Sequence, residues 1–330
     1  MPGRVLITQP IPEPGPSLVR GFASEVVENT EDRVLSPEEL RRKADGCDAI
    51  LCLLTDRIDA ELLDAAKGCR VVANMAVGYN NIDVDAATQR GIVVTNTPGV
   101  LTEATADLTW ALILGVARRV AEGDLEMRAG RFQGWGPLYM LGADVAGATL
   151  GLVGPGRIAT AVARRSVGFR MRVLYHGLEP SPELDALGGR QVPLDELLAD
   201  SDFVSLHVPL GEQTRHLIDA RALSLMKPTA YLVNTSRGPV VDEKALVEAL
   251  RSGRIAGAGL DVYEDEPRMA TGLAGCPNTV LLPHLGSATR QARAAMSRTA
   301  AEDLIAVLDR RRPQHPVNPE VLDRADDRSR

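Results

Sequence analysis

Residues 151–160 read GLVGPGRIAT and continue an apolar, β-branched stretch that begins at Thr149. A Gly-x-Gly turn between a strand and a helix is typical of a dinucleotide-binding loop. Gly154 would make the tight turn, and Gly156 would let backbone amides approach a pyrophosphate at the helix N-terminus. Ala159 stands at the third glycine position, where a small residue suffices for close packing. The segment therefore predicts a cofactor loop, although it lies far into the chain.

Strand-like and helix-like segments alternate on both sides of this loop. The strand-like segments before it are 5–8, 49–54, 70–77 and 92–96. Those from the loop onward are 149–154, 172–176, 203–209, 230–236, 258–263 and 279–284. Helical segments lie between them, including 37–44, for which Ser36 is the expected N-cap. This alternation indicates βαβ units and two open parallel α/β sheets, of which the second is larger.

Two longer helices are expected next to the second series. Residues 102–130 read as one helix with Leu108, Ala111, Leu112, Gly115 and Val116 along one side. An amphipathic helix over about 288–310 precedes a polar tail, and it is expected to return to the first sheet because chain ends often lie close together. We therefore predict one domain from 1–98 and 288–330, and a second from 99–287.

The composition is that of a globular protein, with 45% hydrophobic and 25% charged residues. A net charge of −7 and the absence of a basic block beyond Arg310–Arg312 argue against nucleic acid. There is no signal-peptide pattern and no run of about 18 apolar residues. The four cysteines have no metal-ligand spacing. We expect a cytoplasmic protein with no metal, membrane or nucleic-acid partner.

Three polar residues each follow a predicted strand of the second series: Arg237, Glu266 and His284. Open α/β sheets bind ligands at the carboxyl ends of their strands. A guanidinium can grip a carboxylate with two hydrogen bonds, and an imidazole can transfer a proton at neutral pH. We interpret these three as catalytic and the other histidines, His176, His207, His216 and His315, as structural or cofactor-lining.

The cofactor's ribose partner is not evident from the sequence. An acid is expected at the end of the second strand after the loop, to bind the ribose of NAD. Gly177 and Leu178 stand there instead, no arginine is present for a 2′-phosphate, and Glu179 is as compatible with a solvated loop. The choice between NAD and NADP stays open.

Taken together, the chain resembles the D-isomer-specific 2-hydroxyacid dehydrogenase family, and within it the glyoxylate and hydroxypyruvate reductases. Beyond the cofactor loop, the resemblance rests on residues 76–114, NTSRGPVVDEKALVEAL (234–250), GAGLDVYEDEP (257–267) and LLPHLGSAT (281–289). It implies a Rossmann-type nucleotide-binding domain inserted in a smaller, flavodoxin-like α/β substrate domain. It also implies a homodimer through the nucleotide-binding domain, with the segment around Trp135 reaching the neighbouring subunit.

The resemblance also implies roles for individual residues. Arg237 would bind the substrate, His284 would be the acid/base and Glu266 its carboxylate partner. Val77 and Gly78 would hold the substrate carboxylate through backbone amides. The implied cofactor-binding residues are Thr105, Gly154, Pro155, Gly156, Arg157, Ile158, Gly177, Leu178, His207, Pro209, Thr214, Thr235, Ser236, Asp261 and Gly286.

The implied activity is NAD(P)-dependent reduction of a small 2-oxo acid, glyoxylate or hydroxypyruvate, to the D-2-hydroxy acid. Two alternatives are a dehydrogenase of D-lactate or D-3-phosphoglycerate and a non-enzymatic, nucleotide-sensing corepressor. Phosphite oxidation is disfavoured because the family's phosphite dehydrogenase has a lysine where Val77 stands.

Overall fold

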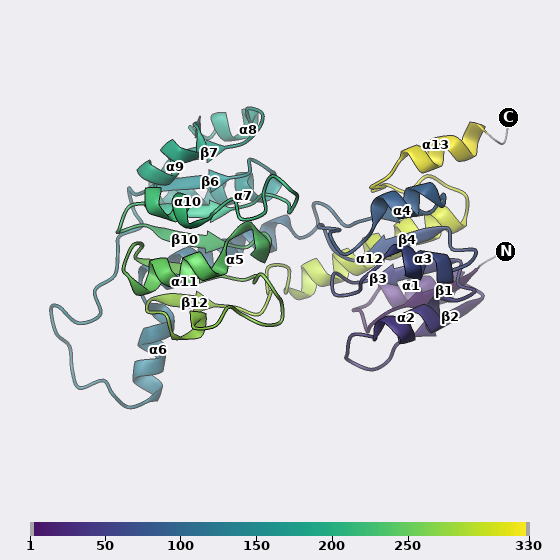
Figure 1. The fold of residues 1–330 in the computed structure, drawn as a ribbon, viewed down its shortest axis with the longest axis horizontal. Helices are drawn as coiled ribbons and strands as arrows, with labels where there is room; N and C mark the ends of the chain where they lie inside the picture. Colours follow the sequence, from purple (N-terminus) through teal and green to yellow (C-terminus); the bar gives the residue numbers. More distant parts are fainter. Residues whose placement is uncertain (1–2, 328–330) are drawn as a thin grey trace. The chain divides into compact units, whose positions relative to one another are not determined.

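The computed structural model describes residues 3–327 and consists of two compact units. Unit 1 contains Met1–Leu101 and Ala288–Arg330, and unit 2 contains Thr102–Ser287. Each unit has its own parallel sheet and its own helices (Figure 1). Unit 2 is therefore inserted in the sequence of unit 1.

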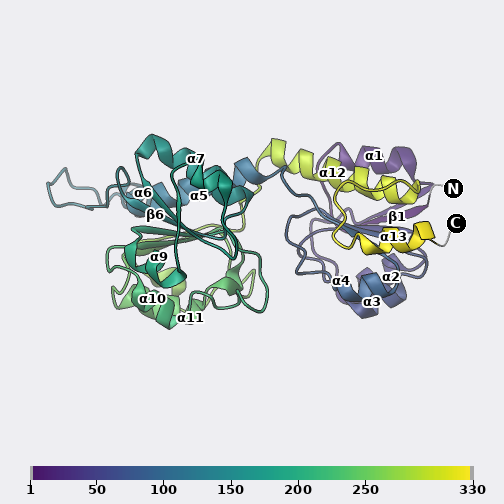
Figure 2. The same cartoon turned by 90° about the horizontal axis from the view of Figure 1, so that it is seen from above.

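Unit 1 is built on five parallel strands in the order β2-β1-β3-β4-β5, which is the flavodoxin-like order. The strands are β1 (Arg4–Ile7), β2 (Glu25–Glu28), β3 (Ala49–Cys52), β4 (Val71–Asn74) and β5 (Val93–Thr95). One face of the sheet is covered by α1 (Gly15–Phe22) and α12 (Arg290–Leu308) (Figure 2). The other face is covered by α2 (Pro37–Ala44), α3 (Ala60–Ala65) and α4 (Val84–Gln89).

Local sequence signals explain most of these elements. β3 and β4 are buried along their whole length, as expected for strands covered on both faces. Ser36 caps α2 in a capping box with Glu39, and Asp59 and Asp83 cap α3 and α4. The sequence did not predict α1 or β2, because β2 is only partly buried and lacks an apolar run.

Unit 2 has seven parallel strands in the order β12-β11-β10-β9-β6-β7-β8, a Rossmann order with one further strand at the β12 edge. They are β6 (Thr149–Val153), β7 (Arg172–His176), β8 (Arg190–Gln191), β9 (Phe203–Leu206), β10 (Tyr231–Asn234), β11 (Gly257–Leu260) and β12 (Thr279–Leu281). With unit 1, this confirms the predicted α/β fold class.

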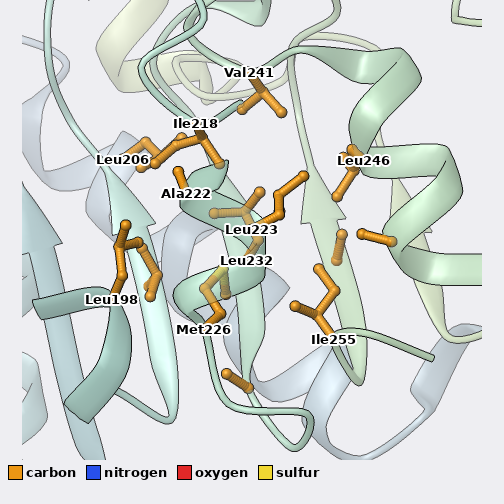
Figure 3. Close-up of a cluster of buried hydrophobic side chains, with 14 of the residues drawn as sticks. Leu198, Leu206, Ile218, Ala222, Leu223, Met226, Leu232, Val241, Leu246 and Ile255 are labelled. Carbon is orange, nitrogen blue, oxygen red and sulfur yellow. The ribbon is translucent and has the colours of Figure 1, made fainter. Parts of the chain in front are cut away.

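The helices of unit 2 lie on both faces of its sheet (Figure 2). One side carries α5 (Thr102–Ala117) and α7 (Arg157–Ser166), and the other carries α9 (Leu194–Asp200), α10 (Ala220–Leu225) and α11 (Glu243–Arg251). Shorter pieces are α8 (Pro182–Asp185) and the 3₁₀ turns Val167–Phe169, Gly238–Val240 and Leu273–Gly275. Figure 3 shows the core on the second side, where Ile218, Leu223 and Leu232 are fully or almost fully buried.

The structure corrects the prediction of one helix over residues 102–130. The chain forms α5 and then α6 (Val120–Arg128), and Arg119 between them has a left-handed φ of 53°. A left-handed residue cannot continue a right-handed helix, so the helix breaks there. On α5, Ala111 is exposed and Leu108 only partly buried, whereas Trp110 and Ile113 are buried.

The polar tail after α12 contains regular structure that the sequence did not predict. After α12, Pro316 forms an isolated antiparallel bridge with Thr95, the last residue of β5, and α13 (Glu320–Asp327) follows. α12 itself packs against α1 and against β3, β4 and β5 of unit 1. Among the described residues, no helix is both long and apolar enough to cross a membrane.

Candidate active site

The loop at 154–158 turns tightly and leaves open space at the N-terminus of α7. Gly154 has a φ of 96°, and a Cβ there would lie 2.8 Å from the backbone carbon of His207. A Cβ on Gly156, the N-cap of α7, would meet nothing within 4 Å, so the space beside the helix N-terminus is open. Pro155 and Ile158 are partly exposed and Arg157 is exposed. These residues fit a dinucleotide, whose phosphates the first amides of α7 would bind.

Gly177 lies directly against this loop. A Cβ at Gly177 would be 2.4 Å from Cδ of Pro155, so no acidic side chain fits there unless Pro155 moves. The carbonyl of Gly177 accepts a hydrogen bond from Gln191 Nε2 at 3.0 Å, and Leu178 is 91% exposed. The absence of an acid at this position thus has a packing reason.

Two of the predicted cofactor-binding residues after β9, His207 and Thr214, have different surroundings. His207 lies beside Gly154, its ring nitrogen Nε2 is 2.9 Å from Ser205 Oγ, and burial lowers its pKa to about 3. A neutral ring at physiological pH suits a lining residue better than a proton donor. Thr214 Oγ1 donates to the carbonyl of Pro209 at 2.7 Å and accepts from Gly211 N at 2.8 Å, which closes the loop.

A buried polar cluster joins α5 to the end of β11 and to the segment after β12. Thr105 Oγ1 donates to the carbonyl of Gly286 at 3.1 Å. Asp261 accepts from the backbone N–H groups of Leu285 and Gly286 at 2.6 and 2.8 Å. Burial raises the pKa of Asp261, although these two bonds favour its charged form. The structure therefore brings Thr105, Asp261 and Gly286 together.

Thr109 links this cluster to Thr235 and was not anticipated from the sequence. Its hydroxyl lies 2.9 Å from the carbonyl of Thr105 and 3.0 Å from Thr235 Oγ1. Thr109 is one of three threonines in α5, and the sequence does not distinguish it as having such a role. It fixes α5 relative to the end of β10, where Arg237 follows.

Asn234 shapes the turn that carries Arg237. Its side-chain oxygen accepts from Ser236 N at 3.0 Å and Ser236 Oγ at 2.8 Å, and its amide donates to the carbonyl of Arg237 at 3.0 Å. An asparagine at a strand end, bonded to the backbone two residues on, is a known turn-forming signal. Burial lowers the pKa of Arg237, while the charge of Glu266 acts in the opposite direction. The guanidinium stays charged in any case.

His284 and Glu266 form a close pair. His284 Nδ1 lies 2.8 Å from Glu266 Oε2, and Glu266 Oε1 accepts from Tyr263 N at 3.0 Å. Burial alone would raise the pKa of Glu266, but the hydrogen bond and charge of His284, with the charge of Arg237, hold it below its ordinary value. The structure therefore brings Arg237, Glu266 and His284 into one electrostatic group.

A buried carboxylate supports the segment that carries Glu266. Glu243, 3% exposed, accepts from the N–H groups of Glu264 and Ala270. A Cβ on Gly238 would lie 1.8 Å from the carbonyl of Tyr263, so the turn after Arg237 and the segment before Glu266 touch. The backbone contact between these two segments therefore fixes Arg237 and Glu266 relative to each other.

Glu266→Gln keeps the shape of the side chain and removes its charge. Because the folded pKa lies below the unfolded value of about 4.3, ionised Glu266 stabilises the fold above that pH. This contribution is lost as the pH falls from about 4.3 through the lower folded pKa. We expect Glu266→Gln to lower the free energy of unfolding at pH 7 and the loss to shrink in acid, as measured by urea denaturation across pH. The exposed Glu248→Gln serves as control, and a loss independent of pH would contradict the prediction.

Val77 and Gly78 lie in unit 1, in the loop that follows β4, and both are partly exposed. Among the described residues of the chain, no cluster of three or more His, Cys, Asp or Glu side chains offers a metal site.

Comparison with known proteins agrees with this architecture. Residues 110–286 match the family model described as D-isomer specific 2-hydroxyacid dehydrogenase, NAD binding domain. The chain is 50% identical to a glyoxylate reductase of Thermococcus onnurineus, with 98% of each chain covered.

Two solved structures are also similar along most of their length. A glyoxylate reductase from Paecilomyes thermophila is 34% identical with a TM-score of 0.87, over 97% of this chain and 99% of that one. An NADPH-dependent glyoxylate/hydroxypyruvate reductase from Sinorhizobium meliloti, in complex with NADP and malonate, is 34% identical with a TM-score of 0.85, over 96% and 97%. The inserted Rossmann unit, the strand-end residues and this similarity along almost the whole sequence lead to one conclusion: the chain belongs to the D-isomer-specific 2-hydroxyacid dehydrogenase family.

Proposed function

We propose that this protein is an NAD(P)-dependent reductase that converts glyoxylate, and also hydroxypyruvate, to the corresponding 2-hydroxy acid, in the D form where the product is chiral. The observation that carries the proposal is the pair of His284 and Glu266, 2.8 Å apart, in electrostatic contact with Arg237 on the unit that carries the cofactor loop. A proton donor and a carboxylate-binding cation are the two groups that this reaction needs from the protein.

When bound, the nicotinamide supplies the hydride for the keto carbon. Glu266 holds Nδ1 of His284, which leaves Nε2 to donate a proton to the substrate oxygen. Arg237 binds the substrate and stabilises the negative charge that develops on that oxygen. The backbone amides of Val77 and Gly78 bind the substrate carboxylate.

The cofactor-binding residues are proposed in two groups. Gly154, Pro155, Gly156, Arg157 and Ile158 bind the pyrophosphate, with Gly177, Leu178 and His207 near the adenosine. A second set surrounds the nicotinamide and its ribose: Thr105, Pro209, Thr214, Thr235, Ser236, Asp261 and Gly286. With a glycine at 177, no carboxylate at this position repels the 2′-phosphate of NADP, so both cofactors belong in the test.

The direct test is a steady-state panel on the purified protein. Glyoxylate, hydroxypyruvate, pyruvate and phosphohydroxypyruvate are each combined with NADH and NADPH. We expect the highest kcat/KM with glyoxylate or hydroxypyruvate. Preference for pyruvate or phosphohydroxypyruvate would favour the other dehydrogenase activities, and no turnover with any pair would favour a nucleotide-sensing role.

We further propose a homodimer formed through unit 2. The segment after α6 carries exposed apolar side chains, among them Trp135 at 85% and Leu138 at 82% exposure. Figure 1 shows α6 and this segment extending from the body of unit 2. Exposing these apolar side chains to water is unfavourable in a monomer, whereas a second copy of the chain would bury them.

The double variant Trp135→Ser with Leu138→Ser tests this interface. Burying each large side chain contributes about 1.5–3 kcal/mol, so the dimer dissociation constant should rise by at least about 10²-fold. Light scattering after size exclusion would show the mass fall from twice the chain mass toward the chain mass. Val167→Ser, at another exposed apolar position, is the control. An unchanged mass in the double variant at all concentrations would exclude this interface.

We also propose that the protein works in the cytoplasm. All four cysteines are buried and none is in a disulfide. Free thiols persist in reducing compartments.

A further inference from the structure

Three consecutive carbonyl groups in the loop after β4 are each held by a hydrogen bond. The carbonyl of Ala76 accepts from the N–H of Thr97 at 2.9 Å. The carbonyl of Val77 accepts from the side-chain amide of Asn96 at 2.7 Å. The carbonyl of Gly78 accepts from the side-chain amide of Asn74 at 2.9 Å. The loop is thus fixed from the ends of two neighbouring strands, β4 and β5.

Holding the carbonyls also orients the N–H groups. In a trans peptide unit the C=O and the following N–H point in opposite directions. The N–H groups of Val77, Gly78 and Tyr79 therefore point away from their three hydrogen-bonded carbonyls. In the described part of unit 1, none of these three N–H groups donates a hydrogen bond. Successive free N–H groups are suited to bind an anion.

The two asparagines are themselves fixed. Asn74 is fully buried, and its side-chain oxygen lies 3.7 Å from Cys52 Sγ, which leaves its NH₂ group facing Gly78. Asn96 is positioned by the segment after α12, since its backbone N–H donates to the carbonyl of His315 at 3.3 Å. His315 in turn is held through Nδ1, 2.8 Å from Asp303 Oδ2.

We propose that Asn96 and Asn74 are positioning residues for carboxylate binding. By holding the carbonyls of Val77 and Gly78, they direct the loop's N–H groups toward the substrate carboxylate. This inference rests on the proposed function, because it assigns a task to a loop that the proposal places at the substrate. Asn96 is the better test position because it is only partly buried, whereas Asn74 lies in the core.

The test is Asn96→Asp, which keeps the size of the side chain and replaces the donating amide by a carboxylate that cannot donate. We expect the KM for glyoxylate to rise about tenfold or more, the scale for an unmet buried hydrogen bond. The kcat and the KM for NAD(P)H should stay within about threefold of the wild-type values. The variant weakens binding of the substrate carboxylate equally in the ground state and the transition state, which changes the KM for glyoxylate and not kcat. The Kd of malonate, an unreactive dicarboxylate, measured by calorimetry with bound cofactor, should rise in parallel. Asn96→Ala should also raise the KM for glyoxylate and the Kd of malonate, and it does so without adding a charge.

Asn29→Asp is the matched control. Its amide also donates to backbone carbonyls in unit 1, those of Thr8 and Arg33, both at 3.0 Å, but not to the loop. An unchanged KM and malonate Kd in Asn96→Asp, or an equal rise in Asn29→Asp, would overturn the inference. If the wild type fails to reduce glyoxylate, the proposed function fails, and the malonate Kd of the variants still decides the role of Asn96.

Discussion

Replacing His284 by asparagine is expected to lower kcat for glyoxylate reduction by about 10²- to 10⁴-fold, the usual contribution of a general acid. Asparagine cannot donate a proton at neutral pH as imidazolium does. It is a better choice than alanine because His284 has a left-handed φ of 55°, which asparagine tolerates. The KM for NAD(P)H should change little, because the cofactor loop is not altered.

His216 offers a matched control for this variant. It too has a left-handed φ, 51°, and it too is paired with a carboxylate, with Nε2 2.6 Å from Glu264 Oε1. We expect His216→Asn to retain kcat within about threefold. Both variants lose an ion pair, so their free energies of unfolding should fall by similar amounts. Near wild-type turnover in His284→Asn, or an equal loss in both variants, would refute the assignment of His284 as proton donor.

Arg237→Lys is expected to lower kcat/KM for glyoxylate by about 10²- to 10³-fold. Lysine keeps the charge but lacks the planar fork that binds a carboxylate with two hydrogen bonds. Losing a buried, charged contact costs about 2–5 kcal/mol, or about 30- to 5,000-fold, and the expected loss lies in the middle of that range. The effect should appear in both kcat and KM, because Arg237 is proposed to bind the substrate and to stabilise the charge that forms on its oxygen.

Arg165→Lys controls for the exchange itself. Arg165 lies on the same unit and is paired with Glu103 and Asp107, both at 2.7 Å. Its replacement should leave kcat/KM within about twofold, since both of its carboxylate partners are exposed and ion pairs at the surface contribute little. Retention of wild-type kcat/KM by Arg237→Lys would show that this residue does not bind the substrate as proposed.

The sequence predicted the elements that have a clear local pattern, such as an apolar run or an N-cap residue. The predicted strand segments 49–54 and 70–77 contain the buried strands β3 and β4, and Ser36 caps its helix as expected. The break at Arg119 was missed because nothing local distinguishes an arginine that adopts a left-handed conformation, whereas a glycine there would have indicated it. Residues on both sides of the break bond to distant parts of the chain, since the carbonyl of Ala117 accepts from Ala143 N and Glu122 accepts from Asn278 N.

Some candidate site residues were also predictable from the sequence, whereas others were found only in the structure. Arg237, Glu266 and His284 were identifiable because each follows a strand, and their roles stay predictions until tested. Thr109 and Asn96 were not singled out, because each bonds to a group far away in the sequence. Asn234 was also missed, although its partners Ser236 and Arg237 are local and an asparagine at a strand end is a turn-forming signal. The hydroxyl of Thr235 and the backbone carbonyl of Val77 lie far from Thr109 and Asn96 in the sequence, and no spacing rule connects them. The packing of Gly177 against Pro155 likewise became visible only with coordinates.

The insertion of unit 2 has a consequence for how the protein is made. On the ribosome, residues 102–287 are synthesised before α12, which packs against α1 and three strands of unit 1. Domains generally fold as units while synthesis proceeds from the N-terminus. Here the N-terminal unit cannot complete its fold first, because its buried residues Ala300, Ala301 and Leu304 are synthesised after unit 2. A nascent chain released before residue 290 would carry a complete unit 2 and an unfinished unit 1.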